Sequence, residues 1–187
     1  MKRMGMFLFC MMIFVMVAAC AGGPPMGSQP FKGTGGPVIT NYYCQTKANY
    51  GSPLNVYLEV DDPEGNMSHI ATVVNQTGYG TYPTSWKYLA YRYRAHFKGY
   101  LQWNTMSSDA MMNMPEWTNI TITVAVYDKT GNQSNNVVFP VQFVNEAVAS
   151  PPLPPPFNQG GLPRVGYIDI DLENPEAPDG PMGGPRI

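Results

Sequence analysis

Two stretches in the second half of the chain alternate strictly between apolar and polar side chains. Successive side chains of a β-strand point to opposite faces of its sheet, so this period of two predicts strands with one buried face. The alternation therefore makes a β-sheet domain the first expectation for the fold. The apolar positions are Ile120, Ile122, Val124 and Val126 in the first stretch and Val137, Phe139, Val141 and Phe143 in the second.

Three further strands are predicted earlier in the chain, over residues 38–44, 55–60 and 68–74. Residues 61–66 (Asp-Asp-Pro-Glu-Gly-Asn) and 128–132 (Asp-Lys-Thr-Gly-Asn) separate neighbouring strands. Both contain the Asp, Asn and Gly that chain reversals favour, and both are predicted to be turns.

The run from Leu89 to Asn104 also alternates, with apolar and aromatic side chains at its odd positions. Its even positions begin with a basic row, which we interpret as a solvated strand face that could also meet anionic glycans or lipid headgroups. Sixteen residues is long for one strand, so we expect a bulge or break near Gly99. The basic row consists of Arg92, Arg94, His96 and Lys98.

About seven strands within residues 38–144 favour two packed sheets. The turn after residues 55–60 and the hairpin Val126-Tyr-Asp-Lys-Thr-Gly-Asn-Gln-Ser134 resemble those of bacterial immunoglobulin-like domains. This resemblance implies an all-β, immunoglobulin-like antiparallel β-sandwich of about seven strands. The paired cysteines around a tryptophan that mark antibody domains are absent from the sequence.

The N-terminus begins with Lys2 and Arg3, continues with an uncharged apolar run to Ala19, and reaches Cys20. This order is typical of a secretory signal peptide. Val17-Ala18-Ala19-Cys20 resembles the lipobox of bacterial lipoprotein precursors. The resemblance implies that residues 1–19 are removed and that Cys20 receives a diacylglycerol on its thiol and an acyl chain, such as palmitate, on its amine.

The resemblance places the protein in the cell envelope, held to a membrane by its lipid. Ala21 favours the outer membrane or cell surface over the inner membrane, because a residue other than Asp there directs enteric lipoproteins outward. Two alternatives remain open, an ordinary cleaved signal and an uncleaved signal anchor.

Segments rich in Gly and Pro flank the predicted sandwich. Residues 20–37 hold the lipidated Cys and a flexible tether, and residues 145–187 are expected to form a Pro-rich, mostly disordered tail. Pro151–Pro156 has five prolines in six residues and predicts a polyproline stalk. Residues 164–172 alternate like a strand and could dock on a partner or on the chain's own sandwich, or remain disordered.

Composition narrows the function classes. Only 13% of residues are charged and the formal net charge is −2, which argues against nucleic acid as a partner. The chain has two histidines and none of the common nucleophile, metalloprotease or phosphate-loop motifs. We therefore expect a protein that is not an enzyme.

An aromatic-rich stretch over residues 79–103 is the candidate binding surface, because rings with polar tips suit contacts with proteins or sugars. The competing interpretation is that most of these rings pack the core and its rims. The candidate residues are Tyr79, Tyr82, Trp86, Tyr88, Arg92, Arg94 and Tyr100.

No metal or cofactor is expected. Two clusters nevertheless contain side chains that could serve as metal ligands. Thioethers suit Cu(I), and the cluster Met106, Met111, Met112 and Met114 raises copper handling as a distant alternative. The acidic turn at residues 61–66 could offer oxygen ligands to calcium, but an ordinary Asx-type turn is the preferred interpretation. Cys44 is the one thiol of the mature chain apart from Cys20, so no intrachain disulfide is expected.

The sequence thus predicts a membrane-anchored envelope lipoprotein that acts as a non-catalytic binding or structural module with a protein partner. The first alternative is a glycan-binding module that uses the aromatic stretch at residues 79–103.

Overall fold

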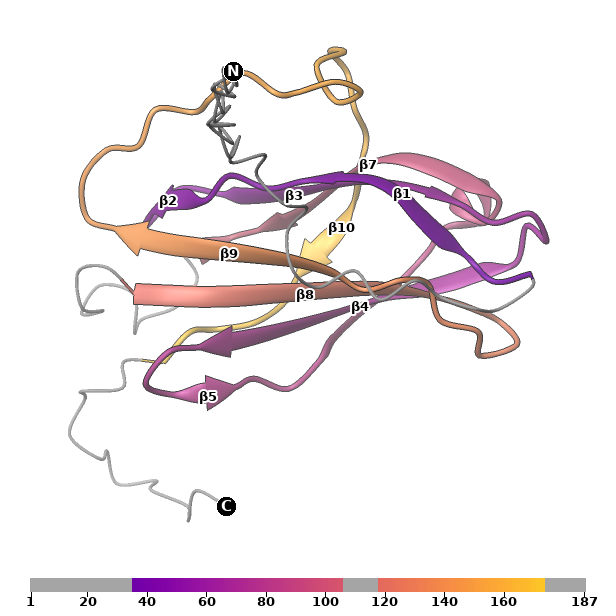
Figure 1. Ribbon diagram of the computed structural model, residues 1–187, viewed down its shortest axis with the longest axis horizontal. Helices are drawn as coiled ribbons and strands as arrows, with labels where there is room; N and C mark the ends of the chain where they lie inside the picture. Colours follow the sequence, from indigo (N-terminus) through magenta and orange to yellow (C-terminus); the bar gives the residue numbers. More distant parts are fainter. Residues whose placement is uncertain (1–34, 106–117, 174–187) are drawn as a thin grey trace, which may run out of the picture.

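The computed structural model of the chain describes residues 35–105 and 118–173. In these ranges the chain forms two β-sheets packed face to face (Figure 1). One sheet has four strands in the order β1-β3-β7-β10. The other has six, in the order β2-β9-β8-β4-β5 with β6 also paired to β4. The strands are β1 Val38–Tyr43, β2 Lys47–Asn49, β3 Leu54–Asp61, β4 Met67–Gln76, β5 Gly80–Thr81, β6 Ser85–Tyr88, β7 His96–Trp103, β8 Thr118–Asp128, β9 Val137–Val144 and β10 Arg164–Ile168.

The predicted alternation produces the core between the sheets. In β8, Ile122, Val124 and Val126 are fully buried, and the matching positions of β3 and β9 are buried as well. Burying a side chain of this size contributes about 1.5–3 kcal/mol relative to leaving it exposed. The all-β, immunoglobulin-like sandwich is therefore confirmed.

The strand count and the pairing differ in detail from the expectation. The described residues contain ten strands, of which β2, β5, β6 and β10 have five residues or fewer. β2, β5 and β6 carry too few alternating positions to be recognised from sequence, whereas β10 falls within the strand-like pattern predicted at residues 164–172. The sandwich is also not wholly antiparallel, because β10 pairs in parallel with β7 and β2 pairs in parallel with β9.

The expected long strand over residues 89–104 is interrupted near its start instead of at Gly99. A short 3₁₀ helix, η1 (Tyr91–Tyr93), precedes β7. Tyr93 is 9% exposed, and its ring lies 6.1 Å from that of Phe97. Because this turn places an aromatic ring in the core, residues 92 and 94 do not share the strand face of Lys98.

Gly99 remains inside β7, opposite Leu58 of β3. A Cβ atom at Gly99 would lie 2.4 Å from the carbonyl oxygen of Pro163 and 2.7 Å from Val165 Cγ2. The amide of Tyr100 donates to that Pro163 oxygen at 3.1 Å. The glycine therefore marks a close approach of two backbones where a break was expected.

The tail belongs to the sandwich as far as Leu172, beyond the predicted domain boundary at residue 144. β10 joins the four-stranded sheet, and its apolar residues and those that follow fill the edge of the core. Of the outcomes considered for residues 164–172, the structure shows docking on the chain's own sandwich. The buried residues are Val165, Ile168, Ile170 and Leu172, which are 8%, 3%, 8% and 1% exposed.

Residues 145–163 connect β9 to β10 and arch over the outer face of the four-stranded sheet (Figure 1). Phe157 holds this crossover against the sheet. It is 1% exposed, and its ring centroid lies 5.7 Å from that of Tyr57. The proline run therefore lies along the domain and does not project as a stalk.

Several predicted features lie outside the described residues. They are the signal peptide, Cys20 and most of the tether within residues 1–34, the methionine cluster within residues 106–117, and the end of the tail from residue 174. In the two described ranges, no helix is long and apolar enough to cross a membrane.

Candidate functional site

The aromatic residues predicted to bind a partner occupy different environments. Tyr82 is 6% exposed, and its hydroxyl bonds with the Gln76 side chain and accepts the amide of Glu173 at 2.6 Å. Burial raises the pKa of Tyr82 to about 12. Tyr79 stacks on Tyr82 with ring centroids 4.8 Å apart. Tyr82 therefore clamps the tail and is not part of an open surface.

Tyr100 lies on the opposite side of the molecule, on the outer face of the four-stranded sheet. Its ring is 5.6 Å from that of Tyr57, which in turn meets Phe157 of the crossover. Tyr100 is therefore separated from Trp86 and Tyr88 by the thickness of the sandwich.

Trp86 and Tyr88 meet two further aromatic side chains on the outer face of the six-stranded sheet. We call this cluster, His69 of β4, Trp86 and Tyr88 of β6 and Tyr127 of β8, the aromatic platform. Strand register explains it, since His69 lies opposite both Tyr88 and Tyr127. Directly opposite residues of antiparallel strands project from the same face.

Small residues provide the floor of the platform. Ala71 of β4 lies between Trp86 and Ala125 in the strand register. Both alanines are on the outer face, yet they are only 7% and 5% exposed. The short side chains leave room for the larger rings that lie beside them.

The rings of the platform hold one another in place. His69 stacks on Tyr127 with centroids 5.2 Å apart and an interplanar angle of 6°. Trp86 meets His69 at 5.0 Å and Tyr127 at 5.8 Å, and Tyr88 meets His69 at 5.7 Å. Trp86 is nevertheless 51% exposed and Tyr88 75% exposed. The platform is thus a pre-arranged apolar surface that remains open to solvent.

His69 is the centre of the platform and is predominantly neutral at pH 7, because burial lowers its pKa from the ordinary value of 6.5. Its Nδ1 atom is buried and has no hydrogen-bond partner among the described residues. The group is therefore suited to packing against rings more than to carrying charge.

The sequence did not single out His69 or Tyr127. Both fall on the outward-facing positions of predicted strands, where an aromatic side chain among polar neighbours was the available signal. The strand pairing that brings them to Trp86 and Tyr88 joins residues 69, 86–88 and 127, and the sequence alone does not specify that pairing.

The predicted basic row is divided by the 3₁₀ helix. Arg92 Cζ lies 4.8 Å from the ring centroid of Tyr93, and Arg94 Cζ lies 5.4 Å from that of Tyr91. The row therefore does not form one cationic strand face. Its other two members lie beside carboxylates, His96 with Asp61 at 2.8 Å and Lys98 with Glu59 at 2.9 Å.

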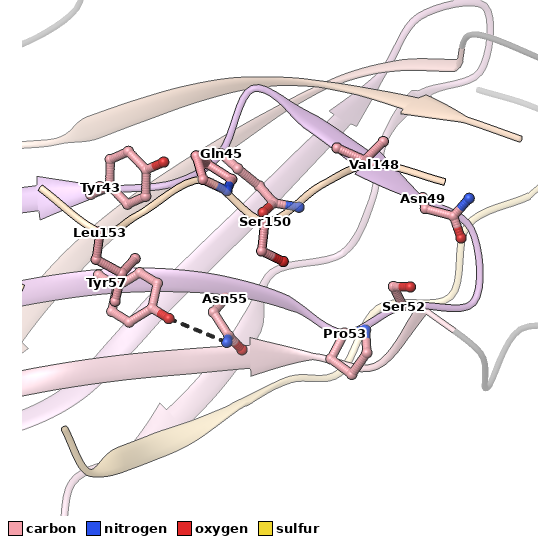
Figure 2. Close-up of a pocket in the computed structure, with 11 residues that line it drawn as sticks. Tyr43, Gln45, Asn49, Ser52, Pro53, Asn55, Tyr57, Val148, Ser150 and Leu153 are labelled. Atoms are coloured by element: carbon pink, nitrogen blue, oxygen red, sulfur yellow. Dashed lines mark hydrogen bonds between the residues drawn. The ribbon is translucent and has the colours of Figure 1, made fainter. Parts of the chain in front are cut away.

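A second candidate site is a pocket of about 190 Å³ on the outer face of the four-stranded sheet (Figure 2). Its walls come from β1–β3 and their connections and from the crossover, which meet only in the folded chain. No side chain in its lining carries a formal charge. The lining residues are Tyr43, Gln45, Asn49, Ser52, Pro53, Asn55, Tyr57, Val148, Ser150, Pro151 and Leu153.

Amide and phenol groups give this pocket its chemistry. Figure 2 shows Asn55 Nδ2 directed at the hydroxyl of Tyr57, 3.4 Å away. The Asn55 Oδ1 atom is buried and has no partner within the described part of the chain. The rings of Tyr43 and Tyr57 lie 6.2 Å apart. Such a lining suits a small neutral molecule that forms hydrogen bonds.

The acidic turn at residues 61–66 is an Asx-type turn, the preferred interpretation. The Asp62 carboxylate accepts the amides of Glu64 at 3.1 Å and Asn66 at 3.0 Å, and Gly65 has a φ of +67°. Among residues 35–105 and 118–173, no three His, Cys, Asp or Glu side chains are grouped so as to hold a metal ion.

Cys44 packs against the core at the end of β1. Burial raises the pKa of its thiol to about 12, so the nucleophilic thiolate is scarce at neutral pH. Its environment is that of a structural cysteine.

No protein-family model matches the chain. No curated protein matches it either. Among solved structures, the chain is similar to the CARDB domain of the PF1109 protein from Pyrococcus furiosus, which was crystallised in complex with di-metal ions. The two share 12% sequence identity with a TM-score of 0.33, over 63% of this chain and 100% of that domain.

Proposed function

We propose that this protein is a non-catalytic binding module of the bacterial cell envelope, anchored through a lipid on Cys20, and that the aromatic platform contacts a protein partner. The observation that carries the binding role is the platform itself, an exposed cluster of packed rings on the outer face of a sheet. The signal-like N-terminus and its lipobox-like motif support the proposed location in the cell envelope.

The chemistry of the platform supports a protein contact. Trp and Tyr are enriched among the residues that dominate binding energy, because they bury a large area at a low entropic cost. Trp86 and Tyr88 are already held by His69, so little ordering is needed when a partner covers them. The nearest cation on the same strand, Lys87, projects to the other face and approaches Gly166.

Photocrosslinking in intact cells tests this role. A photoreactive amino acid at Tyr88 should yield a discrete crosslinked species, and Trp86→Ala in the same chain should reduce its amount strongly. Tyr91, which is 83% exposed but outside the platform, is the matched control position. Equal crosslinking from positions 88 and 91, insensitive to Trp86→Ala, would overturn the proposal.

Glycan binding is the second candidate function, and the uncharged pocket favours it. Amides, phenol hydroxyls and tyrosine rings are the groups that recognise a neutral sugar through hydrogen bonds and stacking. On a glycan array the chain should then bind neutral oligosaccharides, and Asn55→Ala should abolish binding while Trp86→Ala does not. Loss on Trp86→Ala alone would place the sugar on the platform. Absence of binding would exclude this function.

Copper handling by the methionine cluster is the most distant alternative. Copper that is retained through dialysis and lost on substitution of Met112 and Met114 would favour it. If the original and the substituted chain retain equal amounts of copper, this alternative is excluded.

A further inference from the structure

The tail segment of residues 164–173, which we call the latch, occupies a groove between the edges of β6 and β7. β10 forms its first part and pairs with β7 from Arg164, opposite Tyr100, to Ile168, opposite Trp103. β10 ends at Ile168, so the rest of the latch lies outside the described strands. It continues to Glu173 and contacts both sheets, Trp103 of β7 at Ile170 and Gln76 of β4 at Glu173.

Buried side chains bind the backbone of the latch after β10. Trp103 Nε1 donates to the Ile170 carbonyl at 2.8 Å, and Gln76 Nε2 donates to the Glu173 carbonyl at 2.8 Å. The amide of Asp169 donates to Ser85 Oγ at 3.1 Å. The amide of Glu173 donates to the Tyr82 hydroxyl at 2.6 Å. The four side chains that hold the latch are 8% exposed or less.

These contacts are those of a site that binds an extended peptide. Fixed side-chain groups satisfy the backbone, and pockets between the sheets take alternate apolar side chains. Without an occupant, the Trp103 indole and the Gln76 amide would lose hydrogen bonds that buried polar groups require. The groove therefore favours an occupant with the spacing of Ile168, Ile170 and Leu172.

The connection to the latch contains an exposed loop suited to a hinge. Residues 158–161 are exposed, and a Cβ atom at Gly160 or Gly161 would meet nothing within 4 Å. Phe157 before the loop is buried against Tyr57, so the crossover can stay in place while the chain beyond it reorients.

We propose that the groove is a strand-acceptor site for a second copy of this chain, in which two molecules exchange latches reciprocally by rotation about residues 158–161. A second copy carries an identical latch, so a reciprocal exchange restores every contact described above. Exchange of an identical element is a low-cost route to a closed dimer with two-fold symmetry. On the lipid anchor proposed above, crowding of copies at the membrane would raise their effective concentration and favour the exchange, but the exchange itself does not require the anchor.

Single cysteines placed across the groove test the exchange. The leaderless chain with Cys20→Ser and Cys44→Ala provides the background. One copy carries Ser85→Cys and the other Asp169→Cys, two positions that touch in the docked latch. The two copies are mixed at high concentration, allowed to equilibrate and then oxidised.

A disulfide-linked heterodimer is expected, with a shift from monomer to dimer mass on a non-reducing gel. The matched control pairs Asp169→Cys with Tyr91→Cys, an exposed position outside the groove. Heterodimer yields equal to this control, or an absence of dimer, would overturn the proposal.

A steric block gives an independent check. Gly99→Ala in both copies places a Cβ atom against Pro163 and Val165 and should abolish the linked dimer. A synthetic peptide of residues 164–173 distinguishes a partner peptide from a second copy. If the peptide binds the chain but copies do not crosslink, exchange between copies is ruled out.

Discussion

At the scale of the residue, two buried aspartates organise turns, one directly after β3 and the other at the last residue of β8. Asp62 and Asp128 are 3% and 2% exposed, and each carboxylate accepts backbone amides from the next few residues. Asp128 also accepts the side chains of Thr130 and Asn132, at 2.9 and 2.7 Å. The sequence predicted the turns from Asp, Gly and Asn, and the structure adds the buried carboxylate that satisfies them.

Asp128→Ala should destabilise the domain by about 2 kcal/mol at pH 7, the size expected for hydrogen bonds to a buried charge. Burial acts to raise the pKa of Asp128, but its hydrogen bonds from Asn132 and Thr130 prevail and lower it. The contribution is therefore complete above the pKa of unfolded Asp, about 3.9, and is lost as the pH falls through the lower folded value. Urea denaturation from pH 7 to pH 3 measures it. A difference from wild type that stays constant below pH 4 would contradict this assignment.

Cys44 should react slowly with a disulfide reagent in the native protein. Because burial raises the pKa of its thiol to about 12, very little thiolate is present at pH 8. The measurement uses the leaderless chain with Cys20→Ser, and the same chain in guanidinium chloride is the control that should react rapidly. Complete native labelling within minutes would show that the thiol is exposed.

At the scale of the element, β10 and β7 show what a local sequence pattern predicts and what it does not. The alternation of Ile168, Ile170 and Leu172 indicated a strand, but no local signal identified its partner. The run before β7 alternated equally well, yet Tyr93 enters the core through a 3₁₀ turn. Tertiary packing therefore overrides local periodicity before β7, and it selects the partner of β10.

Leu172→Ala should lower the free energy of unfolding by about 2–4 kcal/mol, since it removes a side chain that is 1% exposed. Chemical denaturation measures the loss. Tyr167→Ala is the matched control in the same segment, because Tyr167 is 39% exposed and should have a small effect. Equal, small effects of the two substitutions would mean that the latch does not contribute to the folded domain.

At the scale of the whole molecule, the sandwich presents different surfaces on its two outer faces. The six-stranded sheet carries the aromatic platform on its outer face. The crossover covers the outer face of the four-stranded sheet (Figure 1), and the uncharged pocket lies between the two. Two candidate contacts are thus available on opposite sides of one module.

Cys20→Ser in the full precursor should abolish the incorporation of labelled palmitate into the protein in growing cells. The expected cause is loss of the thiol that receives the diacylglycerol. Labelling is measured instead of phase partitioning, because the uncleaved apolar leader would itself add membrane affinity. Cys44→Ser is the control and should leave labelling unchanged. Continued labelling of the Cys20→Ser chain would reject lipid anchoring at this residue.

Alternation such as that at Ile122 and Val124 was enough to predict strands with one apolar face, because a period of two can be read from local sequence. The number of such strands then favoured a sandwich. The turns at residues 61–66 and 128–132 were predictable for the same reason. Two of the four residues of the aromatic platform, Trp86 and Tyr88, were predicted from the sequence.

The tertiary structure alone decided the partners of these elements. Register brings His69 and Tyr127 to Trp86, the crossover closes the pocket over Asn55, and the latch fills the groove beside β7. Each arrangement joins residues far apart in the chain. Their pairing depends on shape and hydrogen bonding across the folded core, which a local pattern of apolar residues does not specify.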